Sequence, residues 1–466
     1  MGGSRRGGGC GGEEDEPVSP AGRFFLQPEM DQVINSVFGF ENPIDIPAVK
    51  AECQRTLIRF HPRLRCLLVT DKKGREHWRP APAFDMDDHV LVVPEEDDDG
   101  SESYVSDYVA ALTVSTPLSM EKPLWKMHIL PSRRCIVLRL HHALGDGVSL
   151  MSLFLASCER TDDPSLPVTI PGDGPRGKKA PLTALSLVAL LWRALKVAFF
   201  TFFFVVNFLL HAAWEKDEPN PISGGAGVEL WPRKLVTVTF DLDDIKTVKA
   251  RLNGTINDVL VGIIASGLAK YFKLSSSKES KSNLGITGVA MVNTRETHGL
   301  QDFFRKIKEG KLEWGNRFGF VLLPICLHKS VHNPLEYVHQ AKALLSRKKQ
   351  SLEAHFAYHG GALIMSIFGP KVATLLNYRI LCNTSFTLSN LVGPSEEIMF
   401  VKNPITYIRA TSSGLPHALI IHMISYNGKA DLQLLVAKDI IHDPETLAKC
   451  FEDTLKEMKL LSITKI

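Results

Sequence analysis

The sequence predicts a mixed α/β protein of two domains joined by an apolar segment. Its 466 residues exceed the size of one ordinary hydrophobic core. Short runs rich in branched residues alternate with stretches of helical spacing, as in proteins that combine sheets and helices. Between the two halves lies a segment rich in proline and then in phenylalanine. Prolines at this density exclude a long helix or a central strand, so the first region ends there.

The composition limits the classes of function that we expect. The net charge is only +3, and no long basic run is present, so we expect no nucleic-acid partner. The eight cysteines are scattered without a Cys-x-x-Cys pair. This pattern favours free thiols in a reducing compartment over a disulfide framework or a zinc site.

The composition along the chain divides it into four parts. Residues 1–16 are glycine-rich and then acidic, which predicts a disordered extension and not a signal peptide. Residues 17–171 form the expected N-terminal domain, residues 172–232 a linker, and residues 233–466 the C-terminal domain. In the N-terminal domain the patterns predict helices at 47–60, 103–114 and 148–156, and strands at 65–70, 89–93, 127–130 and 135–140.

The C-terminal domain shows its own strand and helix patterns. Asn427-Gly428 between two apolar runs predicts a hairpin over 418–437. Asp443 and Pro444 are typical of a helix start, and that helix should reach about residue 461. The remaining patterns predict strands at 235–240, 285–293 and 318–324, and helices at 241–251, 259–272 and 333–347.

The linker contains the most apolar stretch of the chain, residues 182–214, with a predicted helix at about 187–214. Residues 197–214 lack Asp, Glu, Lys and Arg, and a helix needs about 17 to 25 apolar residues to cross a bilayer. Arg193 and Lys196 precede this run and Trp214 ends it, as in membrane-seated helices. A helix lying in the membrane interface and a helix buried between domains are the two alternatives.

A histidine pair follows the strand predicted at 135–140. Next to His141 and His142, Gly145 and Gly147 should provide the backbone freedom for a sharp turn. A neutral imidazole there could take a proton from a hydroxyl that attacks a carbonyl. Asp146 could pair with an arginine or cap the next helix, and so fix the turn.

Two other interpretations of this pair remain. It could be a strand end with one packed histidine and a capped helix. It could also bind a metal, but neighbouring strand residues point to opposite faces, so two adjacent histidines rarely bind one ion. We therefore predict no metal.

The motif HHALGDG matches the His-His-x-x-x-Asp-Gly signature of coenzyme A dependent acyltransferases of the chloramphenicol acetyltransferase fold. More narrowly, the chain resembles the plant bifunctional wax ester synthase/diacylglycerol acyltransferase family. The resemblance runs from about Pro17 to the C-terminus. One motif alone would be weak evidence for the family. Six motifs occur in the family's order: HPR at 61–63, PLW at 123–125, HHALGDG at 141–147, NDV at 257–259, NRFGF at 316–320 and SNLVGP at 389–394.

The resemblance implies two acetyltransferase-like domains with a central tunnel. It implies acyl-CoA as co-substrate, no bound cofactor, and a fatty alcohol or a diacylglycerol as acceptor, giving a wax ester or a triacylglycerol. The family assigns the base to the second histidine, His142; the spacing alone does not decide between His141 and His142. Asp146 and Gly147 would fix the turn.

The other motifs have a functional and a structural interpretation. The resemblance includes Asn257 and Asp258 in the active region, where an amide could bind substrate or the oxyanion, yet Thr255 or Asn257 could simply cap a helix. Ser389 to Pro394 should form a tight crossing near the domain interface, or only a turn. Further candidates by motif are Asn316, Gly319, Phe320, Ser389, Asn390 and Gly393, and those expected to shape packing or the channel wall are Pro123, Leu124 and Trp125.

We expect the protein in the endoplasmic reticulum membrane with cytosolic catalytic domains, in contact with membrane lipid; the plasma membrane is the alternative. Two other functions stay open. A soluble acyltransferase of specialised metabolism shares the histidine motif, but usually carries Asp-Phe-Gly-Trp-Gly, which is absent here. A non-enzymatic lipid-binding protein could keep a relic of the motif.

Overall fold

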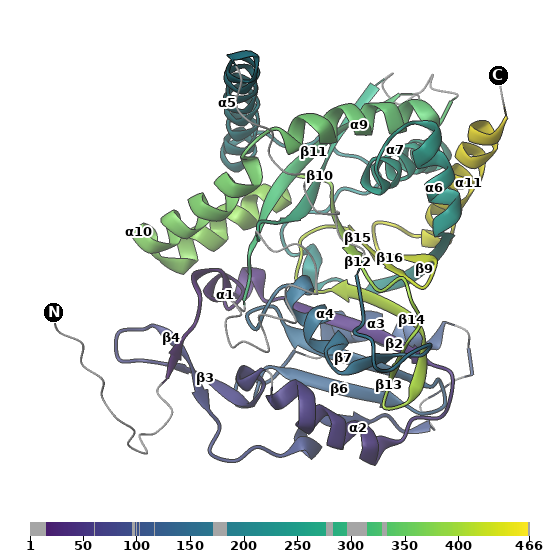
Figure 1. Cartoon of the computed structure of the whole chain (residues 1–466). Coiled ribbons are helices and arrows are strands. Elements are labelled where there is room, and N and C mark those ends of the chain that lie inside the picture. The colour runs from purple at the N-terminus through teal and green to yellow at the C-terminus, as the bar shows by residue number, and fades with distance from the viewer. Residues whose placement is uncertain are drawn as a thin grey trace.

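The computed structural model describes residues 15–59, 61–95, 98, 100–101, 103–115, 117–170, 184–275, 283–295, 315–328 and 333–464. Within these residues, helices and strands intermingle along the whole chain, which confirms the mixed α/β class. The strands of this part form sheets of seven, six and three strands. Figure 1 shows the two larger sheets one above the other.

The seven-stranded sheet carries the histidine motif. Its interior strand β7 is buried at every residue, because β6 and β2 pair with it on both sides and the sheet faces are covered. The order is β5 (Val90–Val92), β6 (Trp125–Leu130), β7 (Cys135–His141), β2 (Val33–Phe40), β14 (Asn403–Ser412), β13 (Ile398–Phe400) and β8 (Cys158–Arg160).

The six-stranded sheet belongs to the second half of the chain. Asn427 and Gly428 have φ of 44° and 76°, and such left-handed pairs form the tight turn that the sequence predicts. The order is β11 (Phe318–His328), β10 (Asn283–Asn293), β12 (Phe386–Val392), β15 (Leu419–Tyr426), β16 (Lys429–Ala437) and β9 (Arg233–Asp241). The helices packed around its apolar core are α6 (Leu242–Arg251), α7 (Ile256–Ser275), α9 (Leu335–Lys349) and α11 (Pro444–Ile463).

The C-terminal half of the chain contributes two strands to the sheet of the N-terminal half. The expected boundary puts residues 233–466 in one domain, but β13 and β14 complete the sheet of the N-terminal half. The sheet topology therefore does not follow the predicted division, because strand pairing depends on distant segments. Ser412 on β14 lies 3.3 Å from the His422 ring on β15, and Arg409 pairs with Asp431 at 2.7 Å. These contacts join the two sheets.

Two 30-residue helices stand at the upper left of the molecule in Figure 1. The first, α5 (Ala184–Ala213), confirms the predicted apolar helix, and its stretch Val188–Ala213 is long and apolar enough to cross a membrane. The second, α10 (Glu353–Cys382), was not predicted; it is bent at Gly369 and Pro370. The remaining helices are α1 (Pro20–Phe24), α2 (Ile46–Cys53) with a π-helical turn at Gln54–Ile58, α3 (Tyr104–Ser115) and α4 (Gly147–Leu155).

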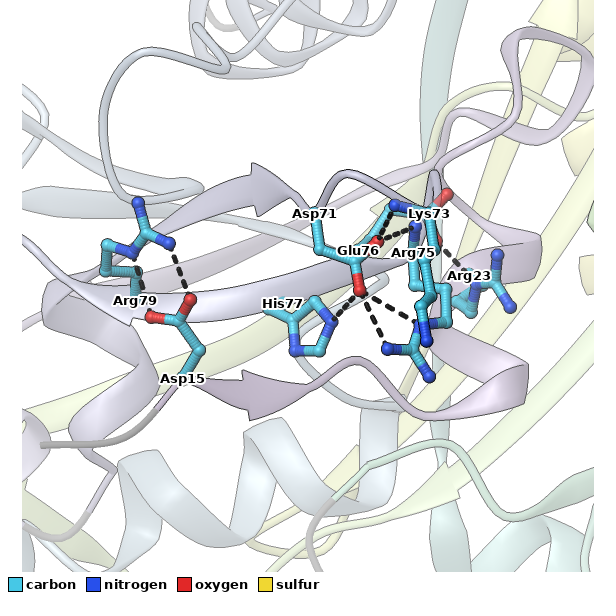
Figure 2. Close-up of polar contacts among 8 residues, drawn as sticks. All are labelled: Asp15, Arg23, Asp71, Lys73, Arg75, Glu76, His77 and Arg79. Carbon is cyan, nitrogen blue, oxygen red and sulfur yellow. Dashed lines mark hydrogen bonds and ion pairs between the residues drawn. The ribbon is translucent and has the colours of Figure 1, made fainter.

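A small sheet holds the N-terminal segment. It consists of β1 (Glu16–Pro17), β4 (Glu76–Pro80) and β3 (Cys66–Thr70). Figure 2 shows Asp15 paired with Arg79, and Arg23 with Glu76. The sequence predicts a disordered extension over residues 1–16, and residues 1–14 of it lie outside the described residues. For Asp15 and Glu16 the expectation is wrong, because ion pairs and strand pairing hold them.

Candidate active site

His142 lies directly after β7, at the level where the two large sheets meet. Its backbone N–H donates to Gln32 O at 2.8 Å, and its side chain is buried. The ring stacks on Phe25, with centroids 4.0 Å apart and planes at 19°. Phe318 of the six-stranded sheet lies at 5.7 Å on a tilt. The imidazole thus contacts an aromatic group from each half of the chain, and these two rings also lie near each other, at 6.1 Å between centroids.

Asn316 fixes the tautomer of His142. The amide nitrogen of Asn316 donates to the backbone carbonyl of His142 at 2.8 Å. Since that carbonyl can only accept, the amide oxygen must face the ring, where it lies 2.9 Å from Nδ1. Nδ1 therefore carries the proton, and Nε2 keeps its lone pair, as a general base requires.

Burial sets the charge of His142. It lowers the pKa of the imidazole to about 4, against the opposing effects of the nearby Asp146 carboxylate and the hydrogen bond to Asn316. The ring is therefore neutral at physiological pH and ready to accept a proton.

Asp146 organises the segment around His142. Its carboxylate caps α4 by accepting from the Ser149 N–H at 3.0 Å, and it also accepts from the Arg317 N–H at 2.9 Å. Arg295 Nη1 lies 2.7 Å from the same carboxylate, and both side chains are buried. Both predicted roles of Asp146, helix cap and arginine partner, occur together. Through Arg317 the carboxylate also positions the neighbouring Asn316.

The role expected for two glycines of the turn is wrong. Neither Gly145 nor Gly147 has a positive φ, so the turn needs no left-handed residue there. A Cβ on Gly145 would lie 3.2 Å from the Ser149 side chain, so close packing favours glycine. A Cβ on Gly147 would meet no atom within 4 Å, and Gly147 lines the cavity beside His142. Its lack of a side chain leaves that space open.

His141 makes different contacts. Its Nε2 lies 2.9 Å from an Asp31 carboxylate oxygen, and its Nδ1 accepts from the Ala143 N–H at 3.0 Å. Both nitrogens are therefore occupied, and the ring does not line the cavities around His142. His141 acts by holding the turn. Among the described residues, no three His, Cys, Asp or Glu side chains lie together as metal ligands would.

Two cavities lie near His142, and Phe318 lines both, whereas His142 itself lines only the first. The first, which we call the intersheet cavity, runs between the two large sheets and is lined by His142, Asp146 and Gly147 with residues of β10, β12, β14 and β15. The second, the α10 cavity, is bounded by α1, β11 and both arms of α10, and includes Asn316. Each half of the chain thus contributes to both spaces.

The intersheet cavity contains unpartnered polar atoms. Asn390 Oδ1, Thr411 Oγ1 and His422 Nδ1 are shielded from solvent and have no hydrogen-bond partner among the described residues. All three residues line this cavity. Burial, and then proximity to His142, lowers the pKa of His422 to about 4, so its ring is neutral. Because buried polar groups are normally satisfied, these atoms form a place for a hydrogen-bonding substrate group.

Asn257 and Asp258 have separate roles. The Asp258 carboxylate accepts from the Thr255 N–H at 2.7 Å, and the Thr255 hydroxyl accepts from the Asp258 N–H at 3.3 Å, which caps α7. Asn257 Oδ1 accepts from Asn390 Nδ2 at 2.7 Å. Asn257 therefore orients a residue of the intersheet cavity without lining it, whereas Asp258 stabilises the helix start.

The expected crossing at residues 389–394 is only partly correct. Ser389 and Asn390 lie within strand β12, in parallel pairing with β15, and both line the intersheet cavity. Only Gly393 and Pro394 follow the strand. A Cβ on Gly393 would lie 2.3 Å from Ser425 O, so close backbone approach requires glycine there.

The remaining motif residues divide between cavity wall and support. Gly319 and Phe320 line the α10 cavity, and a Cβ on Gly319 would lie 1.9 Å from Ala354 O of α10. In the motif Pro123-Leu124-Trp125 all three residues are buried, and Leu124 O accepts from the His141 N–H at 3.0 Å. That motif lines neither cavity; its role is packing beside the histidines.

Sequence reasoning missed several residues of the site. The cavity residues Thr411 and His422 and the contacts Phe25, Asp31 and Arg295 lie in segments that carry no recognisable motif. The pairing of Arg295 with Asp146 joins residues 149 positions apart. The sequence pointed to this ion pair only through the expectation that Asp146 could pair with an arginine.

Comparisons with known proteins agree with this geometry. The model for the wax ester synthase/diacylglycerol acyltransferase catalytic domain matches residues 46–260, and the model for the WS/DGAT C-terminal domain matches residues 314–459. Wax ester synthase/diacylglycerol acyltransferase 4 of Arabidopsis thaliana is 34% identical, covering 97% of this chain and 91% of that protein. Wax ester synthase/diacylglycerol acyltransferase 2 of the same plant is 35% identical, covering 97% of each chain.

Solved structures share the fold. The wax ester synthase/diacylglycerol acyltransferase from Marinobacter aquaeolei VT8 aligns with a TM-score of 0.59 at 16% identity, covering 96% of this chain and 99% of that one. The first condensation domain of the calcium-dependent antibiotic synthetase aligns with a TM-score of 0.59 at 13% identity, covering 97% of each chain. These alignments confirm the expected two-domain acyltransferase fold. With both family models and full-length relatives matching, the chain belongs to the wax ester synthase/diacylglycerol acyltransferase family.

Proposed function

We propose that this protein transfers a long-chain acyl group from acyl-CoA to the hydroxyl of a fatty alcohol or a diacylglycerol. The product is a wax ester or a triacylglycerol. The observation that carries the proposal is the double hydrogen bond between Asn316 and His142. It leaves Nε2 of a neutral, buried imidazole as the basic atom beside the intersheet cavity.

The reaction follows from this arrangement. Nε2 of His142 takes the proton of the acceptor hydroxyl while the hydroxyl oxygen attacks the thioester carbonyl carbon. The tetrahedral intermediate then collapses with cleavage of the C–S bond. The sulfur of coenzyme A leaves with the proton held on His142, which returns the ring to its neutral form. Asp146, close to the ring, stabilises the transient imidazolium.

The two cavities suit two different substrates. The intersheet cavity offers polar atoms from Asn390, Thr411 and His422 beside His142, which fits the thioester end of acyl-CoA. A hydrogen bond to the developing oxyanion would stabilise the transition state. The α10 cavity has a mostly apolar lining that includes Phe24, Phe25 and Phe320. It fits the hydrocarbon chain of the acceptor.

A membrane location follows from the same chemistry. Fatty alcohols and diacylglycerols reside in bilayers, and α5 supplies an exposed apolar helix of sufficient length. We propose that α5 seats the protein in the endoplasmic reticulum membrane, with the catalytic domains in the cytosol. The free cysteines among the described residues are compatible with that reducing compartment.

A competition assay tests the proposal. Purified protein in vesicles receives labelled acyl-CoA with fatty alcohol and diacylglycerol together. Wild-type protein should form labelled ester, and the ratio of the two esters gives the acceptor preference. His142→Ala should abolish ester formation with unchanged membrane attachment, whereas His442→Ala, at an exposed imidazole, should not. Binding of acyl-CoA without turnover by the wild type would favour a lipid-binding protein instead.

A further inference from the structure

The bend of α10 exposes an unusual amount of apolar surface. Gly369 has a φ of 83°, and Pro370 follows it, so the helix divides into arms at 353–368 and 370–382. Large apolar side chains around the bend are 40–64% exposed, namely Leu363, Ile367, Phe368, Val372 and Leu375. We call these five residues the α10 tip. Exposed apolar side chains gathered at one bend point to an interaction site.

Both arms of α10 are anchored on α5. At the start of α10, the Leu352 N–H donates to the Thr201 hydroxyl at 2.9 Å, and Phe356 packs edge-on against Phe208 at 6.3 Å between centroids. Just past its end, Asn383 Nδ2 donates to His211 O at 2.7 Å. The two helices are therefore joined, and Figure 1 shows them leaving the same corner of the molecule, α5 upward and α10 to the left.

Apart from Glu353, which is buried at the start of α10 and pairs with Lys348 at 2.7 Å, the Asp, Glu, Lys and Arg side chains of the two helices have one sign. Residues 184–213 and 354–382 contain no Asp or Glu. The cationic side chains in these ranges are Arg193, Lys196, Lys371 and Arg379. Lys371 is exposed next to the bend. An apolar tip flanked by lysine and arginine alone is complementary to a bilayer with anionic headgroups.

The opposite face of the α10 arms lines a cavity. Ala357, Gly361, Ala362, Met365 and Ala373 all border the α10 cavity, whose wall also includes Phe318. Phe318 packs next to His142. The same bent helix thus presents large apolar side chains outward and mostly small ones, with Tyr358 and Met365, towards the cavity, which suits a passage for a hydrocarbon chain.

We propose that the α10 tip inserts into the surface of an anionic bilayer beside α5, so that the long-chain acceptor passes from the bilayer through the α10 cavity to His142. This inference rests on the proposed function and names the route of one substrate. A water-soluble acceptor does not need this route, since it can diffuse to the site from solvent.

The first experiment compares two acceptors. Full-length protein is placed in phosphatidylcholine vesicles containing phosphatidylserine, with hexadecanol or water-soluble hexanol and the same acyl-CoA. The pair of changes Ile367→Asp and Phe368→Asp should lower kcat/KM for hexadecanol about tenfold or more, because two apolar anchors are lost. The value for hexanol should stay within about twofold. Leu460→Asp, at a similarly exposed leucine on α11, should change neither.

The second experiment measures insertion without activity. Tryptophan replaces Phe368 or, as control, Leu460. The quenching of tryptophan fluorescence by brominated lipid is then compared with that of the unmodified protein. Only Phe368→Trp should add quenchable emission, and Lys371→Glu should reduce it on anionic vesicles. Equal losses with both alcohols, or no added quenching at position 368, would overturn the inference. If the wild type esterifies neither alcohol, the proposed function fails, and the quenching result still decides whether the tip inserts.

Discussion

Replacing Asn316 by leucine should slow the chemical step without preventing folding. The substitution keeps the approximate volume of the side chain but removes both hydrogen bonds to His142, at 2.9 and 2.8 Å. A net value of about 1 kcal/mol for each bond gives about 2 kcal/mol. If this loss raises the activation free energy by the same amount, kcat falls about 30-fold, since about 1.4 kcal/mol corresponds to a tenfold change in rate. KM should change little.

A matched control separates catalysis from stability. Asn403 also bonds to backbone through its side-chain amide, accepting from the Asn42 N–H at 3.0 Å and donating to Asn42 O at 2.9 Å and to Pro43 O at 3.3 Å. It lines neither cavity beside His142. Asn403→Leu should lower the Tm and leave kcat unchanged. If both leucine variants lose kcat equally, the idea that Asn316 fixes the tautomer of His142 is refuted.

A second substitution should shift the pH dependence of kcat/KM in a direction that a change in packing alone would not produce. Asn316→Asp keeps an acceptor for Nδ1 and adds a negative charge beside the ring, so it should raise the pKa of His142. The acid limb of kcat/KM should then move to higher pH, and kcat should stay above that of the leucine variant. Initial rates with labelled acyl-CoA and hexadecanol, measured across pH, give both quantities.

Three further predictions concern the same site. In the wild type, kcat/KM should stay level from about pH 8 to 6 and fall only as the pH approaches the lowered pKa of His142, about 4, because the neutral ring is the active form; half-loss near pH 6.5 would contradict this. Thr411→Val removes an unpartnered buried hydroxyl, so thermal unfolding should show unchanged or higher stability, while kcat should fall about tenfold if that hydroxyl binds the transition state; full activity would mean that it does not. Gly319→Ala should lower the free energy of unfolding by about 1–3 kcal/mol in a denaturant titration, because its Cβ would overlap the Ala354 carbonyl; an unchanged midpoint would show that α10 shifts freely.

Local features of the site could be predicted because they depend on near neighbours. The strand before the histidines, the helix after Asp146 and the turn at Asn427-Gly428 follow from side chains within a few positions of each other. The same holds for α11, which begins at Pro444 after the Asp443 cap, and for the apolar α5.

Two strands that join the domains escaped prediction because polar residues interrupt them. In β2 the buried Asn35 accepts from the Arg139 side chain at 3.2 Å, so a polar residue occupies the core. In β14, Arg409 is satisfied by Asp431 on β16. Each polar group has its partner on another strand, and no periodicity within one strand reveals it.

By itself, the sequence determined the α/β class, the position of the histidine turn and the apolar helix, since backbone propensity and residue periodicity act over a few residues. Tertiary structure decided the surroundings of the two imidazoles, from which we propose His142 as the base. Asn316 lies 174 positions from His142, yet its amide oxygen accepts a hydrogen bond from the His142 ring. The carboxylate of Asp31 is in hydrogen-bond contact with the ring of His141. It also placed Phe25, His422 and the arms of α10 around the site. These contacts arise when distant segments are brought together to bury apolar surface, so their geometry exists only in the folded chain.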